Sequence, residues 1–304
     1  MKARMVFLNV TLSFLALWGP MSLPARAENA DPLWEKVDKT LGRAGKEAPG
    51  EVHKVGWPRS DLKVRVGDVQ IEPALALGSW AAFRKTGKED EVAAMGDLVL
   101  LEPEINPVIT QLQSGGMRIL AVHNHLINES PNVIYLHFSG KGGAAALAKT
   151  LKEALEKTKT PTEPSEVKTP IKLSPSEEEM FKRIQAVLGR NGSMAGRVLQ
   201  VSVPRAEKVE AEGMEIPSGM GVGIPFNFQA VGDRVAATGD FVLVAEEVNP
   251  VIRELRSHGI EVTALHSHML DEAPRFFFLH FWGVDAPEKI AEGLKAVLAH
   301  IRTK

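Results

Sequence analysis

The chain contains one long segment twice, and this duplication constrains its fold more than any other feature of the sequence. Residues 92–109, VAAMGDLVLLEPEINPVI, match residues 235–252, VAATGDFVLVAEEVNPVI, and the upstream stretches 52–64 and 198–209 also correspond. A repeat of this length indicates duplicated domains, because the repeats of a solenoid have much shorter periods. We therefore expect two homologous α+β repeats packed about a pseudo-twofold axis.

Each copy opens with a signal for the start of a helix, Asp31-Pro32 in the first and Ser174-Pro175 in the second. The patterns that follow predict several strands, a helix, two further strands and a closing helix. We expect a mainly antiparallel sheet covered by helices on one side, with one β-α-β step. The predicted internal elements are strands at 97–101 and 240–244, helices at 106–113 and 249–257, and closing helices at 144–157 and 287–301.

The ends of the two repeats are set by a leader and a linker. Lys2 and Arg4 precede an apolar run, and the small-residue motif Ala25-Arg26-Ala27 follows it, so residues 1–27 have the pattern of a cleaved signal peptide. The apolar run is shorter than the ~20 residues of a membrane span, which disfavours an uncleaved anchor. Residues 157–175, rich in Pro, Thr, Lys and Glu, predict an extended linker between a first repeat at 28–156 and a second at 176–304. That linker is also long enough for a beads-on-a-string arrangement.

Composition limits the partners and the chemistry of the chain. The net charge of −2 gives no sign of a nucleic-acid footprint or a polybasic membrane patch. With no cysteine, the chain has no disulfide, no thiolate metal ligand and no lipid-attachment cysteine. We expect an exported protein, periplasmic or secreted, without a membrane span after signal cleavage. Any metal in it must be held by histidines and carboxylates, and nothing in the sequence indicates the oligomeric state.

Six of the nine histidines fall into one repeated pattern, HxH followed twelve residues later by a third histidine. Residues i and i+2 of a strand point to the same side of a sheet. If Pro131 and Pro274 lie at hairpin turns, the third histidine of each copy lies opposite the second, and three imidazoles converge. This geometry suits a divalent transition metal, zinc or copper. The predicted ligands are His123, His125 and His137 in the first repeat and His266, His268 and His280 in the second.

Two other interpretations of the histidines stay open. The surrounding residues are apolar and aromatic, and a lone histidine in such a place is most often a core residue with a satisfied hydrogen bond. Three buried imidazoles are harder to explain in this way, because six ring nitrogens then need partners. A metal-free hydrogen-bonded cluster and a polar ligand pocket are the alternatives to a metal site.

Acidic and basic residues shared by the copies supply further candidates. Glu129 and Glu272 lie in the predicted hairpin turns. Each could be a fourth metal ligand or a general base for metal-bound water. The alternative is an exposed turn carboxylate without a catalytic role. Both copies contain the motif Glu-x-Asn-Pro, which begins at Glu104 and at Glu247. We favour the asparagine as a helix cap before the proline. The alternative is that the glutamate binds the metal. Arg59 and Arg205 are most simply salt-bridge or surface residues, with binding of an anionic substrate as the alternative.

No serine-nucleophile motif, HExxH helix, Walker loop or dinucleotide fingerprint is present. The sequence therefore predicts an exported protein with a His₃ metal site in each repeat, acting as a metal-dependent lyase or hydrolase if it is an enzyme. The rival hypothesis is a non-catalytic envelope protein that binds a small ligand or partner in the aromatic pocket around the histidines. A third is that the histidines are structural and the function lies elsewhere.

Two resemblances accompany these patterns. The HNH and HSH strands with their LHF continuations, the VAAxGDxVL segments and the NPVI segments resemble the LppY/LpqO family, exported bacterial proteins with a domain of unknown function. The resemblance covers nearly the whole chain after residue 27 and implies envelope location or secretion, but no activity. The HxH…H spacing is also similar to the zinc-ligand pattern of acetolactate decarboxylases, over some twenty residues per copy. The glycine-rich lead into their third histidine is absent here, so this is an analogy of site only.

Overall fold

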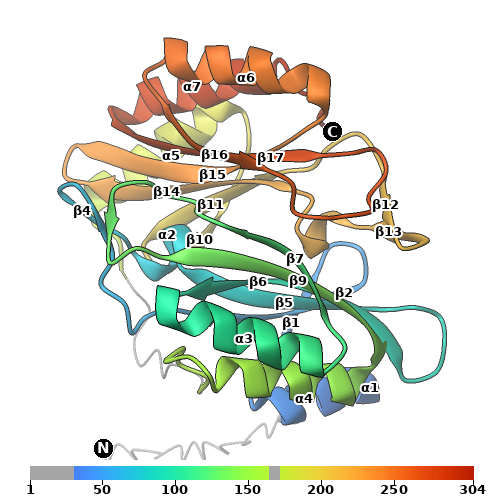
Figure 1. Ribbon diagram of the computed structural model, residues 1–304. Coiled ribbons are helices and arrows are strands. Elements are labelled where there is room, and N and C mark those ends of the chain that lie inside the picture. The colour runs from blue at the N-terminus through green and yellow to red at the C-terminus, as the bar shows by residue number, and fades with distance from the viewer. Residues whose placement is uncertain (1–30, 164–171) are drawn as a thin grey trace, which may run out of the picture. The chain divides into compact units, whose positions relative to one another are not determined.

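The computed structural model describes residues 31–163 and 172–304 (Figure 1). The predicted signal peptide, residues 1–27, lies outside the described residues, as does the middle of the predicted linker. Residues Pro32–Lys304 form one compact unit. None of the helices in the described ranges is long and apolar enough to cross a lipid bilayer.

The first repeat is built around a six-stranded sheet in the order β1-β2-β5-β6-β9-β7, in which every pair of neighbours is antiparallel. Its helices are α1 (Pro32–Leu41), α2 (Pro73–Ala76), α3 (Glu102–Ser114) and α4 (Ala144–Leu155). Its strands are β1 (Lys46–Ala48), β2 (Val52–Pro58), β3 (Arg65–Val66), β4 (Val69–Gln70), β5 (Gly78–Lys85), β6 (Glu91–Leu100), β7 (Arg118–His123), β8 (Glu129–Ser130) and β9 (Ile134–Gly143). The predicted β-α-β step is β6-α3-β7, with β9 inserted between the two parallel strands.

The second repeat has the same plan, with a sheet in the order β10-β11-β14-β15-β17-β16. Its helices are α5 (Pro175–Leu188), α6 (Ala245–Ser257) and α7 (Pro287–Leu298), with a 3₁₀ turn, η1 (Ser218–Met220). Its strands are β10 (Ser193–Ala195), β11 (Val198–Val203), β12 (Val209–Ala211), β13 (Met214–Ile216), β14 (Ile224–Val231), β15 (Arg234–Leu243), β16 (Glu261–His266) and β17 (Phe277–Asp285). The predicted α+β class with a mainly antiparallel sheet is confirmed.

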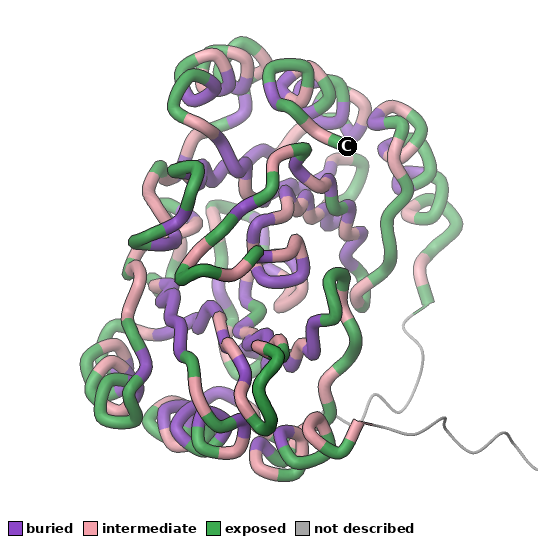
Figure 2. The backbone as a smooth tube through the Cα atoms, turned by 90° about the vertical axis from the view of Figure 1, so that its right-hand side faces the viewer, coloured by how far each residue is buried: buried purple, intermediate pink, exposed green. Residues whose placement is uncertain are grey.

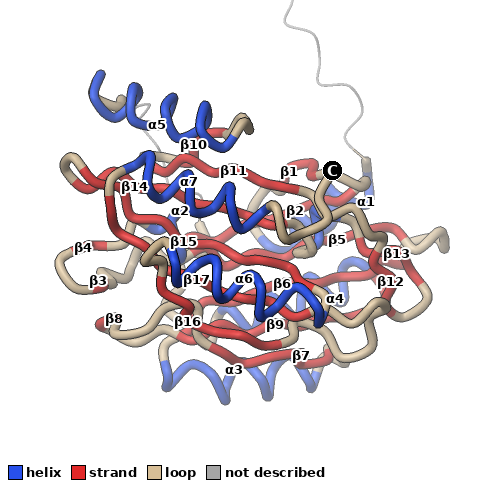
Figure 3. The backbone as a smooth tube through the Cα atoms, turned by 90° about the horizontal axis from the view of Figure 1, so that it is seen from above, coloured by secondary structure: helices blue, strands red, loops and turns tan. Residues whose placement is uncertain are grey.

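Each sheet carries its helices on its outer face and turns its inner face toward the other sheet. Figure 1 shows α1, α3 and α4 outside the first sheet and α5, α6 and α7 outside the second. Figure 3, seen from above, shows α6 and α7 lying across the strands of the second sheet. Apolar side chains such as Val55, Leu98 and Phe138 are buried on the outer face of the first sheet, against its helices. Buried backbone runs through the interior of both repeats (Figure 2).

The helix starts show where sequence patterns were sufficient and where they were not. Ser174 caps α5 in a capping box with Glu177, as predicted. Helices α3 and α6, however, begin four residues before the predicted Asn106 and Asn249. Glu104 supplies the cap from inside the first turn, because its carboxylate accepts the backbone N–H of Leu101 at 2.8 Å. The predicted asparagine caps are therefore wrong, and the Asn-Pro pairs lie within the helices.

Each repeat sends a segment across to the sheet of the other. In the first repeat, the segment that holds α2 lies on the second sheet, where Asn227 Nδ2 donates to Leu75 O at 2.9 Å and Gln229 Nε2 donates to Gln70 O at 2.8 Å. In the second, the hairpin β12–β13 reaches the first sheet, and Arg84 donates to the carbonyl of Glu215. These reciprocal contacts join the repeats as pseudo-twofold packing predicts, and not as beads on a string.

Candidate metal centre

The six repeated histidines all meet between the two sheets. Each ring lies against a ring from the other repeat, and the pairs follow a reciprocal pattern. The ring centroids are 3.6 Å apart for His123 and His266, 3.9 Å for His125 and His280, and 3.8 Å for His137 and His268. The pattern is that of a twofold axis between His123 and His266. The three histidines of each copy converge as predicted, but the two groups also meet each other in one cluster.

The strand register that produces this cluster differs from the prediction. His137 pairs with Ala121 and His123 pairs with Tyr135, with an irregularity between Ile119 and Ala121, so His137 does not lie opposite His125. In the second repeat, His280 likewise pairs with Ala264, and not with His268. The predicted pairing of the second histidine with the third is wrong because a ten-residue connection, 124–133, follows β7 in the first repeat, and the strand ends before the second histidine.

An aromatic residue of the returning strand positions the second histidine of each pattern. The ring of His125 stacks on Tyr135 with centroids 3.5 Å apart and planes 4° apart. The ring of His268 stacks on Phe278 in the same way, at 3.6 Å and 14°. The aromatic residue two positions before the third histidine therefore has the same task in both copies.

The ligand atoms form three overlapping groups, in each of which all donor atoms lie within 4.8 Å of one another. The groups are His123, His266, His268 and His280; His123, His125 and His137; and His125, Asp240 and His280. Two of the three groups draw on both repeats, and His123 belongs to two of them. No described residue outside the six histidines and Asp240 belongs to these groups.

Hydrogen bonds leave four ring nitrogens free toward the centre of the cluster, whereas Nε2 of His266 lies 2.8 Å from Nε2 of His280. Nδ1 of His123 lies 3.1 Å from the carbonyl of Asn124, and Nδ1 of His266 lies 3.2 Å from that of Ser267. A carbonyl oxygen only accepts, so each Nδ1 carries the proton and each Nε2 keeps its lone pair. Among the described residues, the buried Nε2 atoms of His123, His125, His137 and His268 have no hydrogen-bond partner. Orphaned buried polar atoms are uncommon in native proteins, and a bound ion would satisfy these four.

The cluster favours the neutral form of five of its histidines. Burial, and next the neighbouring histidines, lowers the pKa of His137 to about 3 and that of His266 to about 4. The same causes lower the pKa of His123 and hold the pKa values of His125 and His268 well below the ordinary range. Metal binding requires the neutral imidazole, so no proton has to be removed from these five rings at neutral pH.

Two aspartates that the sequence patterns did not reveal, the buried Asp97 and the half-buried Asp240, complete the site. Oδ1 of Asp240 lies 2.5 Å from Nδ1 of His280, and Oδ2 of Asp97 lies 3.8 Å from Nε2 of both His125 and His137. Burial and the charge of Asp240 raise the pKa of Asp97 well above its ordinary value. Burial opposes ionisation of Asp240 too, but His280 outweighs it and the pKa of Asp240 is lowered. The pKa values of the two carboxyl groups are therefore shifted in opposite directions.

The signal that could have identified these aspartates is the Gly-Asp pair present in both copies. A Cβ atom at Gly239 would lie 2.0 Å from the carbonyl oxygen of Pro225, and one at Gly96 would lie 2.5 Å from that of Trp80. Only glycine permits this approach of neighbouring strands. The repeated glycine thus marks a place where the backbone is fixed tightly beside a buried carboxylate.

The carboxylates predicted to be catalytic lie apart from the ligand groups. Glu272 Oε1 accepts the backbone N–H of Phe276 at 3.1 Å, and Glu129 Oε1 that of Val133 at 3.5 Å. Burial raises the pKa of Glu129. Both glutamates thus bond to the backbone four residues later in the chain, and their catalytic role stays a prediction.

The second shared polar motif is structural. Arg59 is fully buried, and its guanidinium donates to Glu104 at 2.8 Å and to the carbonyl of Val99 at 2.7 Å. Arg205 makes the equivalent bond to Glu247 at 2.5 Å. The salt-bridge interpretation of the arginines is confirmed. Binding of an anionic substrate by them, and a reach of Glu104 or Glu247 to the metal, are wrong.

Cavities lie next to the cluster on the inner faces of the sheets. One of about 390 Å³ extends to His125 and Tyr135, and one of about 160 Å³ extends to His137 and His268. Both are lined by Lys54, Trp80, Asp97 and Asp240, among other residues. The larger volume is within the usual range for small-molecule sites, so the histidines adjoin space in which a ligand could bind.

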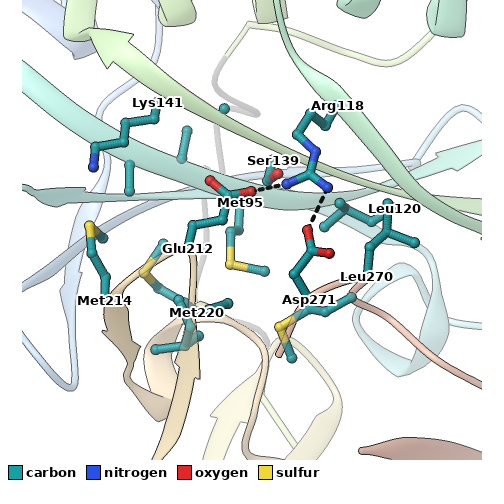
Figure 4. Close-up of a pocket in the computed structure, with 16 residues that line it drawn as sticks. Met95, Arg118, Leu120, Ser139, Lys141, Glu212, Met214, Met220, Leu270 and Asp271 are labelled. Atoms are coloured by element: carbon teal, nitrogen blue, oxygen red, sulfur yellow. Dashed lines mark hydrogen bonds and ion pairs between the residues drawn. The ribbon is translucent and has the colours of Figure 1, made fainter. Parts of the chain in front are cut away.

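A separate hollow of about 40 Å³ lies between the repeats and is lined by none of the six histidines (Figure 4). Methionines of both repeats border it, and Arg118 bridges Glu212 and Asp271 at its side. It is too small for an organic ligand, so its ion pairs and thioethers serve to close the interface.

A known family corresponds to the duplicated unit. Residues 35–157 and again residues 182–300 match the profile of a family described as Domain of Unknown Function (DUF1259). Each match covers one of the two repeats, which confirms the tandem duplication. No curated protein matches the chain significantly.

Two solved structures show a distant similarity. A trimeric bacterial microcompartment shell protein, PduB, is 13% identical, with a TM-score of 0.21 over 84% of this chain and 88% of that chain. EtuB from Clostridium kluyveri is 10% identical, with a TM-score of 0.19 over 84% of this chain and 90% of that chain. TM-scores this low do not establish a common fold, so no property of those proteins is transferred.

Proposed function

We propose that this chain, which belongs to the family described as Domain of Unknown Function (DUF1259), binds a divalent transition metal, zinc or copper, in a centre shared by its two repeats. The observation that carries the proposal is the set of four buried Nε2 atoms that have no hydrogen-bond partner among the described residues and face one cluster. Neutral imidazoles at this spacing are the ligand type that both metals accept.

The surroundings of His280 support the same proposal. Histidine ligands usually donate their second ring N–H to a carboxylate or a carbonyl, which fixes the ring and strengthens the ligand. Asp240 occupies that place beside Nδ1 of His280, while backbone carbonyls occupy it beside His123 and His266. A metal-free hydrogen-bonded cluster would be expected to pair all of the Nε2 atoms, but among the described residues only those of His266 and His280 lie at hydrogen-bond distance from each other, 2.8 Å, and four have no partner.

We further propose that the centre serves a lyase or a hydrolase reaction. A bound transition metal with an open position polarises a carbonyl group or activates water. The two aspartates lie beside it with pKa values shifted in opposite directions, so Asp97 can donate a proton and Asp240 can accept one. Glu129 and Glu272 are the second choice for these steps, because their carboxylates bond to the backbone of their own loops.

A non-catalytic binding protein is the alternative, favoured by the cavity of about 390 Å³ with Trp80 and Tyr135 in its lining. Export to the periplasm or the medium, and membership of the narrower LppY/LpqO group, belong to the proposal as well. They rest on the leader pattern in residues 1–27 and on the repeated HxH…LHF segments.

Elemental mass spectrometry of protein purified without a histidine tag tests the metal. We expect about one or two zinc or copper ions per chain. One triple alanine variant would change His266, His268 and His280, and the other His123, His125 and His137. As a control, the double variant of His258 and His300, which lie outside the cluster, should keep all of its metal.

The two triple variants distinguish a shared centre from separate ones. Because two of the three ligand groups combine both repeats, each triple variant should lose most of the metal. Retention of half of the metal in each variant would show separate sites in the two repeats. If the wild type holds no metal and takes none up on titration, the metal proposal is wrong and ligand binding becomes the leading function.

A further inference from the structure

Lys54 is a cation on the inner face of the first sheet with no equivalent in the second repeat. Val52 at the start of β2 pairs with Arg84, and Val198 at the start of β11 pairs with Gln229. These two pairs are equivalent in the two repeats. Lys54, two residues after Val52, therefore corresponds to Gln200, two residues after Val198. Its Nζ lies 3.9 Å from the centroid of the Trp80 ring. In residues 31–163 and 172–304, no hydrogen bond or ion pair reaches this Nζ atom. The ring attracts the cation but accepts no conventional hydrogen bond from it.

Lys54 lines both cavities beside the histidine cluster. Apart from the histidines, the acidic and basic residues of their linings are Lys54, Asp97 and Asp240. Much of the other lining is small and polar, as at Ser202 and Asn227. Lys54 thus faces the space that a ligand would occupy, from which the metal centre can also be reached.

The ammonium group of Lys54 forms no ion pair with a carboxylate among the described residues. Burial lowers the pKa of Lys54 to about 8, against the opposing effect of Asp97, so the ammonium form predominates at neutral pH. A half-buried cation without an ion-pair partner is stabilised when an anion joins it.

We propose that Lys54 binds the carboxylate of a small organic anion in the cavity of about 390 Å³, beside the histidine cluster. Trp80 covers one side of the ammonium group, and the opposite end of the ligand points toward His125 and Asp240. One ammonium group beside two carboxyl groups suits a single negative charge better than a dianion such as phosphate. A reaction at the other end of the ligand depends on the proposed function. The recognition of the negative charge of the ligand by Lys54 does not.

NMR titration with simple probes tests the recognition. Acetate and propionate are the charged probes, acetamide and propionamide are their uncharged counterparts, and inorganic phosphate is the dianion. The proteins are the wild type, Lys54→Gln, which installs the residue of the second repeat, and Lys54→Arg, which keeps the charge. Each is titrated with and without metal, and metal content and circular dichroism establish that the variants are folded and loaded.

Loss of a hydrogen bond to a charged group should weaken binding of both carboxylates by roughly tenfold or more in Lys54→Gln. Lys54→Arg should retain most of the affinity, and the amides should bind weakly and equally to all three proteins. Carboxylate binding that depends on metal but not on Lys54 would overturn this inference while leaving the metal proposal intact. Dependence on Lys54 in a wild type that contains no metal and takes none up would support the inference and reject the metal proposal. Tighter binding of phosphate than of carboxylates, or no binding of any carboxylate at millimolar concentration, would overturn it as well.

Discussion

The metal-free protein should lose stability steeply as the pH falls below about 6.5. The pKa values of His123, His125, His137, His266 and His268 are all lowered in the folded state, to about 3 for His137 and about 4 for His266. Below the ordinary histidine pKa of 6.5, the unfolded chain therefore binds more protons than the folded one. Stability then falls as the pH falls, from about 6.5 down to the folded-state values of about 4 and 3.

The size of the effect follows from the number of histidines. Each histidine that stays neutral in the folded state lowers the free energy of unfolding by about 1.4 kcal/mol when the pH falls from 7.5 to 5.5. Five such residues give up to about 7 kcal/mol, which is comparable to the whole stability of many domains. Asp97, whose raised pKa acts in the opposite direction, offsets part of it. The protein without metal should thus unfold on mild acidification, and a bound metal should delay this.

Urea denaturation followed by circular dichroism at pH 7.5, 6.5 and 5.5, with a chelator present, measures the effect. The double variant His137→Gln and His266→Gln should lose about 3 kcal/mol of the pH dependence, since glutamine does not titrate. His300→Gln, at an exposed histidine outside the cluster, is the matched control and should behave as the wild type. A free energy of unfolding that stays constant from pH 7.5 to 5.5, or an unchanged slope in the double variant, would refute the reasoning.

Three further predictions concern single residues. Asp240→Asn should weaken metal binding by about ten- to a hundredfold, because the partner of His280 is lost, whereas Glu272→Gln should leave metal binding unchanged. Competition with a chromogenic chelator measures both affinities. Equal affinities of the two variants would contradict this role of Asp240. Arg205→Ala should cost about 3–5 kcal/mol of stability by leaving Glu247 buried without its partner, and a loss below about 1 kcal/mol in urea denaturation would show that the pair is not needed. Gly239→Ala should lower the melting temperature and disturb the centre together, because its Cβ would meet the carbonyl of the adjacent strand; an unchanged melting temperature and metal content would contradict the close approach.

The fold could be predicted because its determinants are local or repeated. Ser174 before Pro175 marked the start of α5, and the duplicated segments gave the plan of both sheets. The starts of α3 and α6 were missed because Glu104 and Glu247 cap these helices from within the first turn, and no Ser, Thr or Asn marks the boundary. A buried arginine far away in the sequence orients each of these carboxylates.

The histidine ligands could also be predicted, but not their relation to one another. Spacing within one copy indicates which side chains share a face of its sheet, yet it says nothing about what that face meets. The meeting of His123 with His266 depends on contacts between the repeats. Asp97 and Asp240 were overlooked because each lies within an otherwise apolar strand, and only the register with His137 and His280 brings them to the site.

The reciprocal pairing of the six rings has an evolutionary consequence. A single unduplicated copy could have built this centre only as a homodimer, with every side chain present twice and both halves identical. Fusion into one chain removed that constraint, because each half could then change alone. Lys54 stands where the second repeat has Gln200, and Trp80 stands where it has Pro225. These changes make the two sides of the twofold centre different. A substrate without symmetry can be held in a single orientation only after such a divergence.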